Sequence, residues 1–365
     1  MLSLNSREYF EKELRERRQR VLDYLFQQGP MANIAPPHLS QAVNSYLMRG
    51  GKCLRSFVLL LSCGAMGGDE QRAIPAGAAI ELYHTWTLVH DDIIDRDDTR
   101  RGSKTIHREF EDKALTELVY QAEEARHYGL SLAIMAGDAQ HAGAKSLLTG
   151  LYTRFQVSPE LVINLVRELE TEVINTLLEG ETLDVQYACQ AIEDMEEDLI
   201  LDMLWKKTGK LYEYSAKAGG LIALNHYDPA DKRVQALASF ASKCGLAFQL
   251  QDDILGIVGN VATLGKPVWS DLLEGKKTLV TYRVFQQAGR DDRKRFLRIL
   301  GNKNASREEL QALTDFIIAS GSIAYAQEIA RAYINEALQQ LEFLPPSHHK
   351  DLLCLWAEST LERQS

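Results

Sequence analysis

The chain has 365 residues, of which 45% are hydrophobic and 25% are charged, and its formal net charge is −10 at pH 7. This acidic excess argues against general nucleic-acid binding, and the longest apolar stretch, around residues 57–66, is too short to span a bilayer. The five cysteines are far apart and form no C-x-x-C pair, so we expect free thiols and a cytoplasmic location. The chain begins with a polar helical stretch that lacks the apolar core of a signal peptide.

Apolar residues recur at spacings of three and four, for example in residues 161–185 and 240–258. The nine prolines stand at the edges of such stretches, where helices begin or end. We therefore predict an all-α protein with one domain, residues 1–365, that forms a single large helical bundle. Residues 109–129 are charged and predict an inserted loop, whereas the polar residues 299–307 predict a connection between two surface helices.

The first candidate site in chain order is the segment GGKCLR, residues 50–55. It places Lys52 and Arg55 three residues apart, just after a flexible diglycine, which fits an anion site near a helix start. Taken alone, each cation is also compatible with an ordinary exposed side chain.

An acidic cluster follows, in which Asp91, Asp92 and Asp95 form a D-D-x-x-D pattern. On a helix Asp91 and Asp95 share a face, where like charges repel unless a cation is bound. Ligands that are all oxygen suit Mg²⁺, and the next basic pair, Arg100 and Arg101, would suit an anion bridged to that metal. The alternative is a solvated acidic helix end, which the flanking apolar residues disfavour.

A second acidic pair, Asp252 and Asp253, lies in another apolar helical stretch. Two such clusters predict acidic walls that face each other across a central cavity, around several Mg²⁺ ions and a polyphosphate.

His84 lies about 20° from Asp91 around an ideal helical wheel, so it is either a ligand-contacting residue or a core histidine. Lys207 and Lys266 lie next to or near glycines, and each is either a phosphate ligand or an ordinary surface lysine. Nucleotide-binding glycine motifs are absent from the sequence.

Taken in order, these motifs resemble those of the trans-isoprenyl diphosphate synthases, the family of farnesyl and geranylgeranyl diphosphate synthases. The resemblance runs from about Gly50 to Leu279 and includes GGKCLRS (50–56), HDDIIDRDDTRRG (90–102), AGD (136–138), GETLD (180–184), KTG (207–209), FQLQDD (248–253) and GKPVWSDLLEGKKT (265–278). Three positions depart from the family pattern. Cys53 replaces the middle arginine of the first motif, Glu181 stands where glutamine is common, and Gly256 replaces the last aspartate of the second acidic motif.

The resemblance implies the fold of the isoprenoid synthases, a homodimer, and a set of roles for the motif residues. Lys52, Arg55, His84 and Arg101 would hold the diphosphate of isopentenyl diphosphate. Arg100, Lys207, Thr208, Gln249 and Lys266 would hold the allylic diphosphate. Asp91 and Asp95 would bind two Mg²⁺ ions and Asp252 a third. Of these, Asp91, Asp95, Arg100, Lys207 and Asp252 would act directly in catalysis.

The implied reaction is the Mg²⁺-dependent ionisation of an allylic diphosphate, followed by attack of the alkene of isopentenyl diphosphate. The alternatives are a class I terpene synthase, against which Lys52, Arg55 and Arg101 argue, and a non-catalytic partner subunit, for which a broken first motif would be expected.

Product length is predicted from two residues that precede the first acidic motif. The family places an aromatic floor of the elongation cavity at Trp86, whereas the next residue, Thr87, is small. One aromatic residue instead of two predicts geranylgeranyl diphosphate (C20), although the bulk of tryptophan would also fit a stop at farnesyl diphosphate (C15). A core tryptophan packed between helices is the competing interpretation of Trp86.

Overall fold

The computed structural model describes residues 4–29, 34–259 and 269–362. Its helices are α1 (Leu4–Gln28), α2 (Pro37–Met48), α3 (Leu54–Ala65), α4 (Glu70–Ile94), α5 (Ile106–Thr116), α6 (Ala122–Phe155), α7 (Pro159–Glu168), α8 (Ile174–Cys189), α9 (Glu197–Leu204), α10 (Lys210–Leu224), α11 (Lys232–Val258), α13 (Ser270–Glu274), α14 (Leu279–Gln287), α15 (Arg290–Ile299), α16 (Arg307–Ala319), α17 (Ser322–Gln340) and α18 (His348–Leu361). Two π-helical turns, η2 (Leu169–Val173) and η4 (Trp205–Gly209), join α7 to α8 and α9 to α10. Within the described ranges the only strands are β1 (Thr99–Arg100) and β2 (Ser103–Lys104). The all-α prediction is therefore confirmed.

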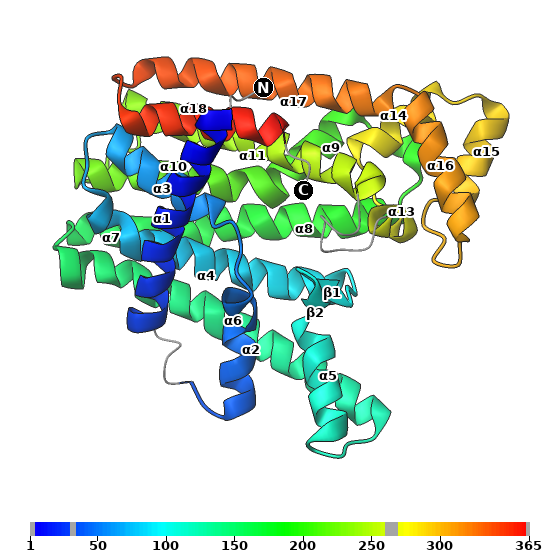
Figure 1. The fold of residues 1–365 in the computed structure, drawn as a ribbon, viewed down its shortest axis with the longest axis horizontal. Coiled ribbons are helices and arrows are strands. Elements are labelled where there is room, and N and C mark those ends of the chain that lie inside the picture. Colours follow the sequence, from blue (N-terminus) through cyan, green and yellow to red (C-terminus); the bar gives the residue numbers. More distant parts are fainter. Residues whose placement is uncertain (1–3, 30–33, 260–268, 363–365) are drawn as a thin grey trace.

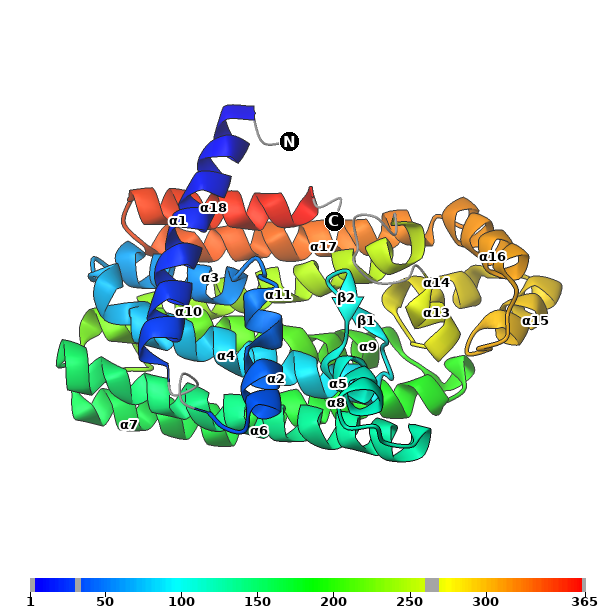
Figure 2. The same ribbon diagram turned by 60° about the horizontal axis from the view of Figure 1, so that its bottom comes forward.

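The long helices form a bundle in which neighbours lie side by side (Figures 1 and 2). Helix α4 packs on α6 and α3, α3 packs on α10, α10 packs on α11, and α11 packs on α17. Helix α1 crosses this bundle and contacts α3 and α4, while α5 projects from one side (Figure 1). Of the helices that carry the candidate site, α4, α10 and α11 thus lie inside the bundle, whereas α8 packs on η4 and α9 with one face buried.

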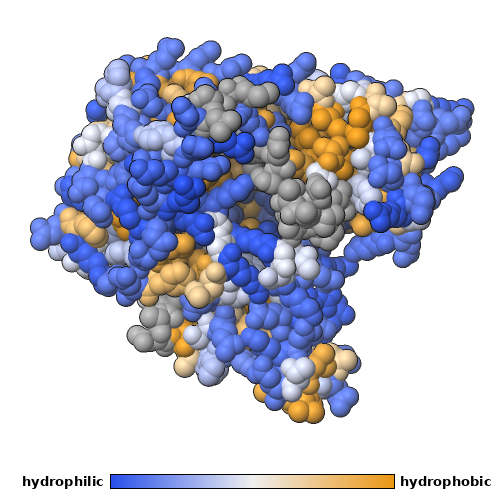
Figure 3. Space-filling model, viewed as in Figure 1, coloured by the Kyte–Doolittle hydropathy of each residue, from blue (hydrophilic) through white to orange (hydrophobic). Residues whose placement is uncertain are grey.

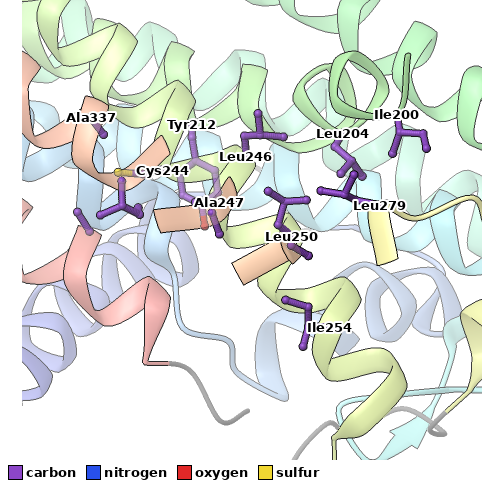
Figure 4. Close-up of a cluster of buried hydrophobic side chains, with 14 of the residues drawn as sticks. Ile200, Leu204, Tyr212, Cys244, Leu246, Ala247, Leu250, Ile254, Leu279 and Ala337 are labelled. Atoms are coloured by element: carbon purple, nitrogen blue, oxygen red, sulfur yellow. The ribbon is translucent and has the colours of Figure 1, made fainter. Parts of the chain in front are cut away.

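Two clusters of buried apolar side chains fill much of the interior. Figure 4 shows one part, in which Leu246, Leu250 and Ile254 of α11 meet Leu204 of α9 and Leu279 of α14. Each of these side chains is at most 5% exposed, and burial of one such side chain contributes about 1.5–3 kcal/mol. This packing fixes α11 relative to α9 and α14, and with it the acidic residues that α11 carries.

A buried ion cluster ties the first, fourth and last helices together. Glu70, the first residue of α4, accepts hydrogen bonds from Arg17 at 2.7 Å and Arg20 at 2.9 Å, and lies 3.0 Å from His349 of α18. Burial raises the pKa of Glu70, but the bonds to His349 and the two arginines outweigh it and lower the pKa to about 2. The charge of Glu70 therefore contributes to the packing of α1 and α18 on α4.

Two local predictions were wrong and one was confirmed. Pro75 lies inside α4 and not at a helix edge, because its ring is buried where α6 approaches at Gly150, and this packing outweighs one lost hydrogen bond. Residues 109–129 are mainly helical, because Ile106, Phe110 and Ala114 give α5 a buried face despite its many charges. Residues 299–307 do connect two helices, α15 and α16.

The face shown in Figure 3 is largely hydrophilic and carries several apolar patches, one of which lies at the tip of α5. Leu115, Leu118, Val119 and Tyr120 form this tip, and Val119 is 79% exposed. None of the helices in the described ranges is long and apolar enough to cross a membrane.

Candidate active site

The first acidic motif occupies the C-terminal end of α4, and its three aspartates have different environments. Asp91 and Asp95 are partly exposed, whereas Asp92 is 1% exposed and accepts hydrogen bonds from the Tyr46 hydroxyl and the Arg100 guanidinium. Burial raises the pKa of Asp92, and Arg100 and Tyr46 oppose this rise. Asp92 thus anchors Arg100, while Asp91 and Asp95 are left to face the interior of the site.

The two-stranded hairpin brings the basic pair back onto α4. Arg100 lies on β1, with its guanidinium 2.5 Å from Asp92 and 3.1 Å from Asp91. Arg101 follows with a φ of +53° and points elsewhere, donating to the carbonyl oxygen of Tyr46 at 3.1 Å. The turn therefore separates two neighbouring arginines into two different sites.

Helix α8 and the π-helical turn η4 supply the opposite wall of the acidic site. Lys207 of η4 lies 2.7 Å from Asp184, 2.9 Å from Glu181 and 3.2 Å from Asp91. These contacts depend on Gly180, where an added Cβ would lie only 2.4 Å from the backbone nitrogen of Lys207. A π-turn inside an α-helix often marks a functional site, and here it presents Lys207 to three carboxylates.

A second lysine joins this network from the connection between α13 and α14. Lys276 lies 2.6 Å from Asp95 and 3.5 Å from Asp184. Burial opposes the positive charges, but the surrounding carboxylates raise the pKa values of Lys207 and Lys276 well above their usual range. Both lysines therefore stay protonated between the acidic side chains.

The carboxylates of this network fit a divalent cation in their chemistry. Ligand oxygens of Asp95, Glu181 and Asp184 lie within 4.8 Å of one another. One oxygen of Glu181 is buried without a hydrogen-bond partner, and burial raises the pKa of this group to about 7. A donor set made only of oxygens suits Mg²⁺.

The second acidic motif faces this network from α11. Asp252 is partly exposed, whereas Asp253 is 6% exposed and accepts a hydrogen bond from Gln249 at 3.0 Å. Gln249 in turn accepts from Thr208 at 2.7 Å, which connects α11 to η4. Burial raises the pKa of Asp253 well above its usual value, and the charges of Asp271, Asp252 and Asp184 add to this effect. The second acidic motif thus interacts electrostatically with Asp184 of the network around Lys207.

Gly256 has a structural consequence at the end of the second motif. A Cβ at this position would lie 2.8 Å from a carboxylate oxygen of Asp271. The absence of a side chain at 256 therefore leaves room for the carboxylate of Asp271 next to α11.

A separate cationic pocket lies between α3, α4 and the hairpin. Arg55 lies 3.0 Å from His84 and stacks over the ring of Tyr212, while Arg101 approaches the backbone of Gly51. Burial lowers the pKa of His84 well below its usual value, and Arg55 and Arg101 lower it further. Burial and the charge of Arg100 also lower the pKa of Arg101. Positive charge thus accumulates here, as in a site for an anion.

Trp86 is buried one turn before the acidic motif. It is 7% exposed, and its ring stacks on His141 of α6 with centroids 4.5 Å apart. The indole nitrogen donates to His90 at 3.1 Å, and the neighbouring Thr87 donates to the carbonyl oxygen of His84 at 2.8 Å. Trp86 is therefore held firmly in one orientation.

The structure brings most of the predicted residues into two adjoining groups. The acidic site contains Asp91, Asp95, Arg100, Lys207, Thr208 and Gln249, and Asp252 lies nearby. The cationic pocket contains Arg55, His84 and Arg101, and Lys52 lies exposed on the turn before Arg55. Lys266 lies outside the described residues. Sequence reasoning gave no role to Asp184 or Tyr46, and it counted Lys276 only among the glycine-flanked cations that are phosphate ligands or surface lysines. The motif GETLD contains Asp184, but Tyr46 had no such signal.

Comparison with known proteins agrees with this geometry. Residues 36–317 match the polyprenyl synthetase family. The geranylgeranyl diphosphate synthase of Sulfolobus acidocaldarius is 38% identical over 305 residues, which are 84% of each chain, and the geranylfarnesyl diphosphate synthase of Aeropyrum pernix is 34% identical over 91% of this chain and 96% of its own. The crystal structure of geranylgeranyl pyrophosphate synthetase from Pyrococcus horikoshii is 34% identical, with a TM-score of 0.81 over 98% of this chain and 99% of its own.

Proposed function

Because this chain belongs to the polyprenyl synthetase family, we propose that it condenses isopentenyl diphosphate with allylic diphosphates and releases geranylgeranyl diphosphate as its main product. One observation carries this proposal: two separate groups of cationic side chains lie beside α4. Arg100 and Lys207 lie among carboxylates on one side, and Arg55, His84 and Arg101 cluster on the other. Two diphosphate substrates need two such groups, whereas a terpene synthase needs only one.

The acidic site takes the allylic diphosphate in this proposal. Asp91, Asp95 and Asp252 hold up to three Mg²⁺ ions, with the side chains of Glu181 and Asp184 within reach of Asp95. Magnesium supplies charge withdrawal from the leaving diphosphate. Arg100, Lys207, Thr208, Gln249 and Lys266 orient that group through charge-assisted and neutral hydrogen bonds. A similar fold from Corynebacterium glutamicum, 26% identical, is known in complex with isoprenyl diphosphate and magnesium.

The cationic pocket takes isopentenyl diphosphate. Lys52, Arg55, His84 and Arg101 bind its diphosphate and so hold its alkene toward the allylic carbon, which converts a bimolecular reaction into a positioned one. The lowered pKa of His84 keeps the imidazole neutral at pH 7, so it acts as a hydrogen-bond partner and not as a further cation. The proton lost after attack passes to the departing diphosphate.

The assignment of the C20 product rests on Trp86. Its ring is buried, clamped against His141, and lies one turn from Asp91, where it would end the space open to a growing chain. The relatives support this length without fixing it, because they include both geranylgeranyl and geranylfarnesyl synthases. Farnesyl diphosphate is the alternative product.

Three further properties belong to the same proposal. A homodimer is supported by large apolar side chains exposed on α6 and α8, namely Ile134, Met135, Leu178 and Val185. A cytoplasmic location is supported by the five cysteines, all of which are free thiols. A single domain is supported by the helices α3, α10 and α11, which pack in sequence through the bundle.

The test is to incubate the purified protein with Mg²⁺, labelled isopentenyl diphosphate and each allylic primer in turn, and to size the products. A C20 product from primers of C5 to C15 is expected. A C15 end product would change the assigned product to farnesyl diphosphate. Cyclised or unelongated hydrocarbons would indicate a terpene synthase. Complete inactivity with every primer would indicate a partner subunit. Light scattering on the same sample tests the dimer.

A further inference from the structure

The turn that carries the cationic pocket lacks one cation of the motif it resembles. Cys53 stands where the motif has an arginine, and it precedes α3 with a φ of +51°. Burial raises the pKa of the Cys53 thiol and Glu81 raises it further, whereas two positive charges, those of Arg18 and Arg101, oppose the rise. A second guanidinium, from α1, therefore reaches the place where the motif arginine is missing.

The position of Arg18 is set by the diglycine of this turn. A Cβ on Gly50 would lie 2.7 Å from Nη2 of Arg18, and a Cβ on Gly51 would lie 2.8 Å from Nη2 of Arg101. Gly50 also has a φ of +80°, which side chains rarely adopt. The two glycines thus let two guanidinium groups approach the backbone just before Cys53.

Arg18 differs from its neighbours on α1 in its partners. Arg17 and Arg20 form ion pairs with Glu70, and Arg15 forms one with Glu11. In the ranges that the structure describes, Arg18 is half-buried and forms no ion pair or hydrogen bond with a carboxylate. Its guanidinium therefore has hydrogen-bond donors that no carboxylate of these ranges occupies, and such donors suit a bound anion.

We propose that Arg18 is a ligand of the isopentenyl diphosphate, supplied from α1 in place of the motif arginine that Cys53 replaces. Its guanidinium and that of Arg101 bind the diphosphate from the two sides of the turn, and Arg55 binds it from α3. This inference rests on the proposed function, since it assigns one more contact to the same pocket. Guanidinium groups suit such a ligand because they donate two parallel hydrogen bonds to phosphate oxygens.

The experiment compares Arg18→Ala with Arg15→Ala, a change one turn earlier on the same helix at an exposed ion pair. Isopentenyl diphosphate does not react without an allylic primer, so calorimetry with this compound alone measures binding directly, and steady-state kinetics measures both KM values. Loss of one hydrogen bond between charged groups corresponds to about 10- to 100-fold. We expect Arg18→Ala to raise the Kd and KM for isopentenyl diphosphate by this factor and to leave the allylic KM within about twofold.

A second substitution separates a ligand role from a structural one. The double variant R18A/C53R returns an arginine to the motif position and leaves it the space of the Arg18 side chain, so it should recover most of the lost affinity. The proposal is wrong if Arg18→Ala binds isopentenyl diphosphate like Arg15→Ala, if both KM values rise together with a fall in Tm, or if C53R does not restore binding. Failure of the wild-type protein to elongate any primer would instead overturn the proposed function.

Discussion

The adjacent residues Asp91 and Asp92 provide a test of the site, because the structure gives them opposite roles. Asp92 is 1% exposed and holds the buried guanidinium of Arg100 at 2.5 Å. The substitution Asp92→Asn keeps the size of the side chain and removes its charge. Removal of one partner of a buried ion pair costs about 3–5 kcal/mol. We expect about 3 kcal/mol here, because Arg100 keeps Asp91 at 3.1 Å and Asp97 at 3.7 Å.

The expected loss can be converted into a melting temperature. The entropy of unfolding is about 2.1 cal/mol/K per residue, so a chain of 365 residues that unfolds as one unit has about 0.8 kcal/mol/K. A loss of about 3 kcal/mol then lowers Tm by roughly 4 °C. Turnover should fall as well, since Arg100 loses the contact that orients it.

The matched substitution Asp91→Asn should behave in the opposite way. The charge of Asp91 raises the pKa of Asp95, after the larger effect of burial, so neutralising Asp91 relieves a repulsion at the end of α4 that offsets the loss of its ion pairs with Arg100 and Lys207. Tm without Mg²⁺ should therefore stay within about 1 °C, while the loss of a metal ligand worth about 3–4 kcal/mol lowers turnover by about 10²- to 10³-fold.

Scanning calorimetry with a chelator present and steady-state kinetics at saturating Mg²⁺ measure the two effects separately. A large fall in Tm for Asp91→Asn together with an unchanged Tm for Asp92→Asn would refute the division of roles. Near-normal turnover of Asp91→Asn at limiting Mg²⁺ would refute its assignment as a metal ligand.

Three further predictions follow from individual contacts. The pKa of Glu70 in the folded protein is about 2, below its usual 4.5, so the charge of Glu70 stabilises the fold above pH 4.5 and this stabilisation is lost as the pH falls toward 2. In denaturant unfolding, Glu70→Gln should therefore lower the free energy of unfolding by about 3 kcal/mol at pH 7. The same variant should show a weaker dependence of stability on pH in the acid range. The Cβ of Gly180→Ala would force η4 away from α8 by about 1 Å and lower kcat/KM about 100-fold. The control is Gly289→Ala, which should change neither activity nor Tm, because the nearest atom to its Cβ would lie 3.8 Å away. Trp86→Ala should shift the products to C25 or longer, and an unchanged product distribution with retained activity would exclude Trp86 as the cavity floor.

The fold class could be predicted from the sequence because helical periodicity is a local signal. Residues 161–185 display it plainly, and the structure places them in α7, η2 and α8. The signal fails where tertiary packing overrides local preference, as at Pro75, and where charged residues hide a narrow apolar face, as in α5. The hairpin of residues 99–104 was missed because two-residue strands are too short to show alternation.

The candidate site was predicted where a motif concentrates charge, and missed where distant elements meet. Asp91 and Asp95 were predicted as metal ligands from their spacing, the apolar residues around them and the arginine pair that follows. The anchor of the motif, Tyr46, lies on α2 and reaches Asp92 across the chain, so no spacing rule contains it. Arg18 is similar, because its place beside Gly50 follows from the way α1 crosses the bundle and not from its own helix.

The electrostatics of the site explain how an acidic chain can bind anionic substrates. Lys207 and Lys276 are shared among Asp91, Asp95, Glu181 and Asp184, so the carboxylates outnumber the lysines and the region keeps a net negative charge. Such a region would attract divalent cations before diphosphate, and Asp95, Glu181 and Asp184 would hold a cation in place of their contacts with Lys207 and Lys276. The same lysines then have donors available for phosphate oxygens. The cationic pocket around Arg55 and Arg101 has no such excess of carboxylates, and in the proposed function it would bind its diphosphate without metal. Binding of isopentenyl diphosphate should consequently be independent of Mg²⁺, whereas binding of the allylic diphosphate should require it.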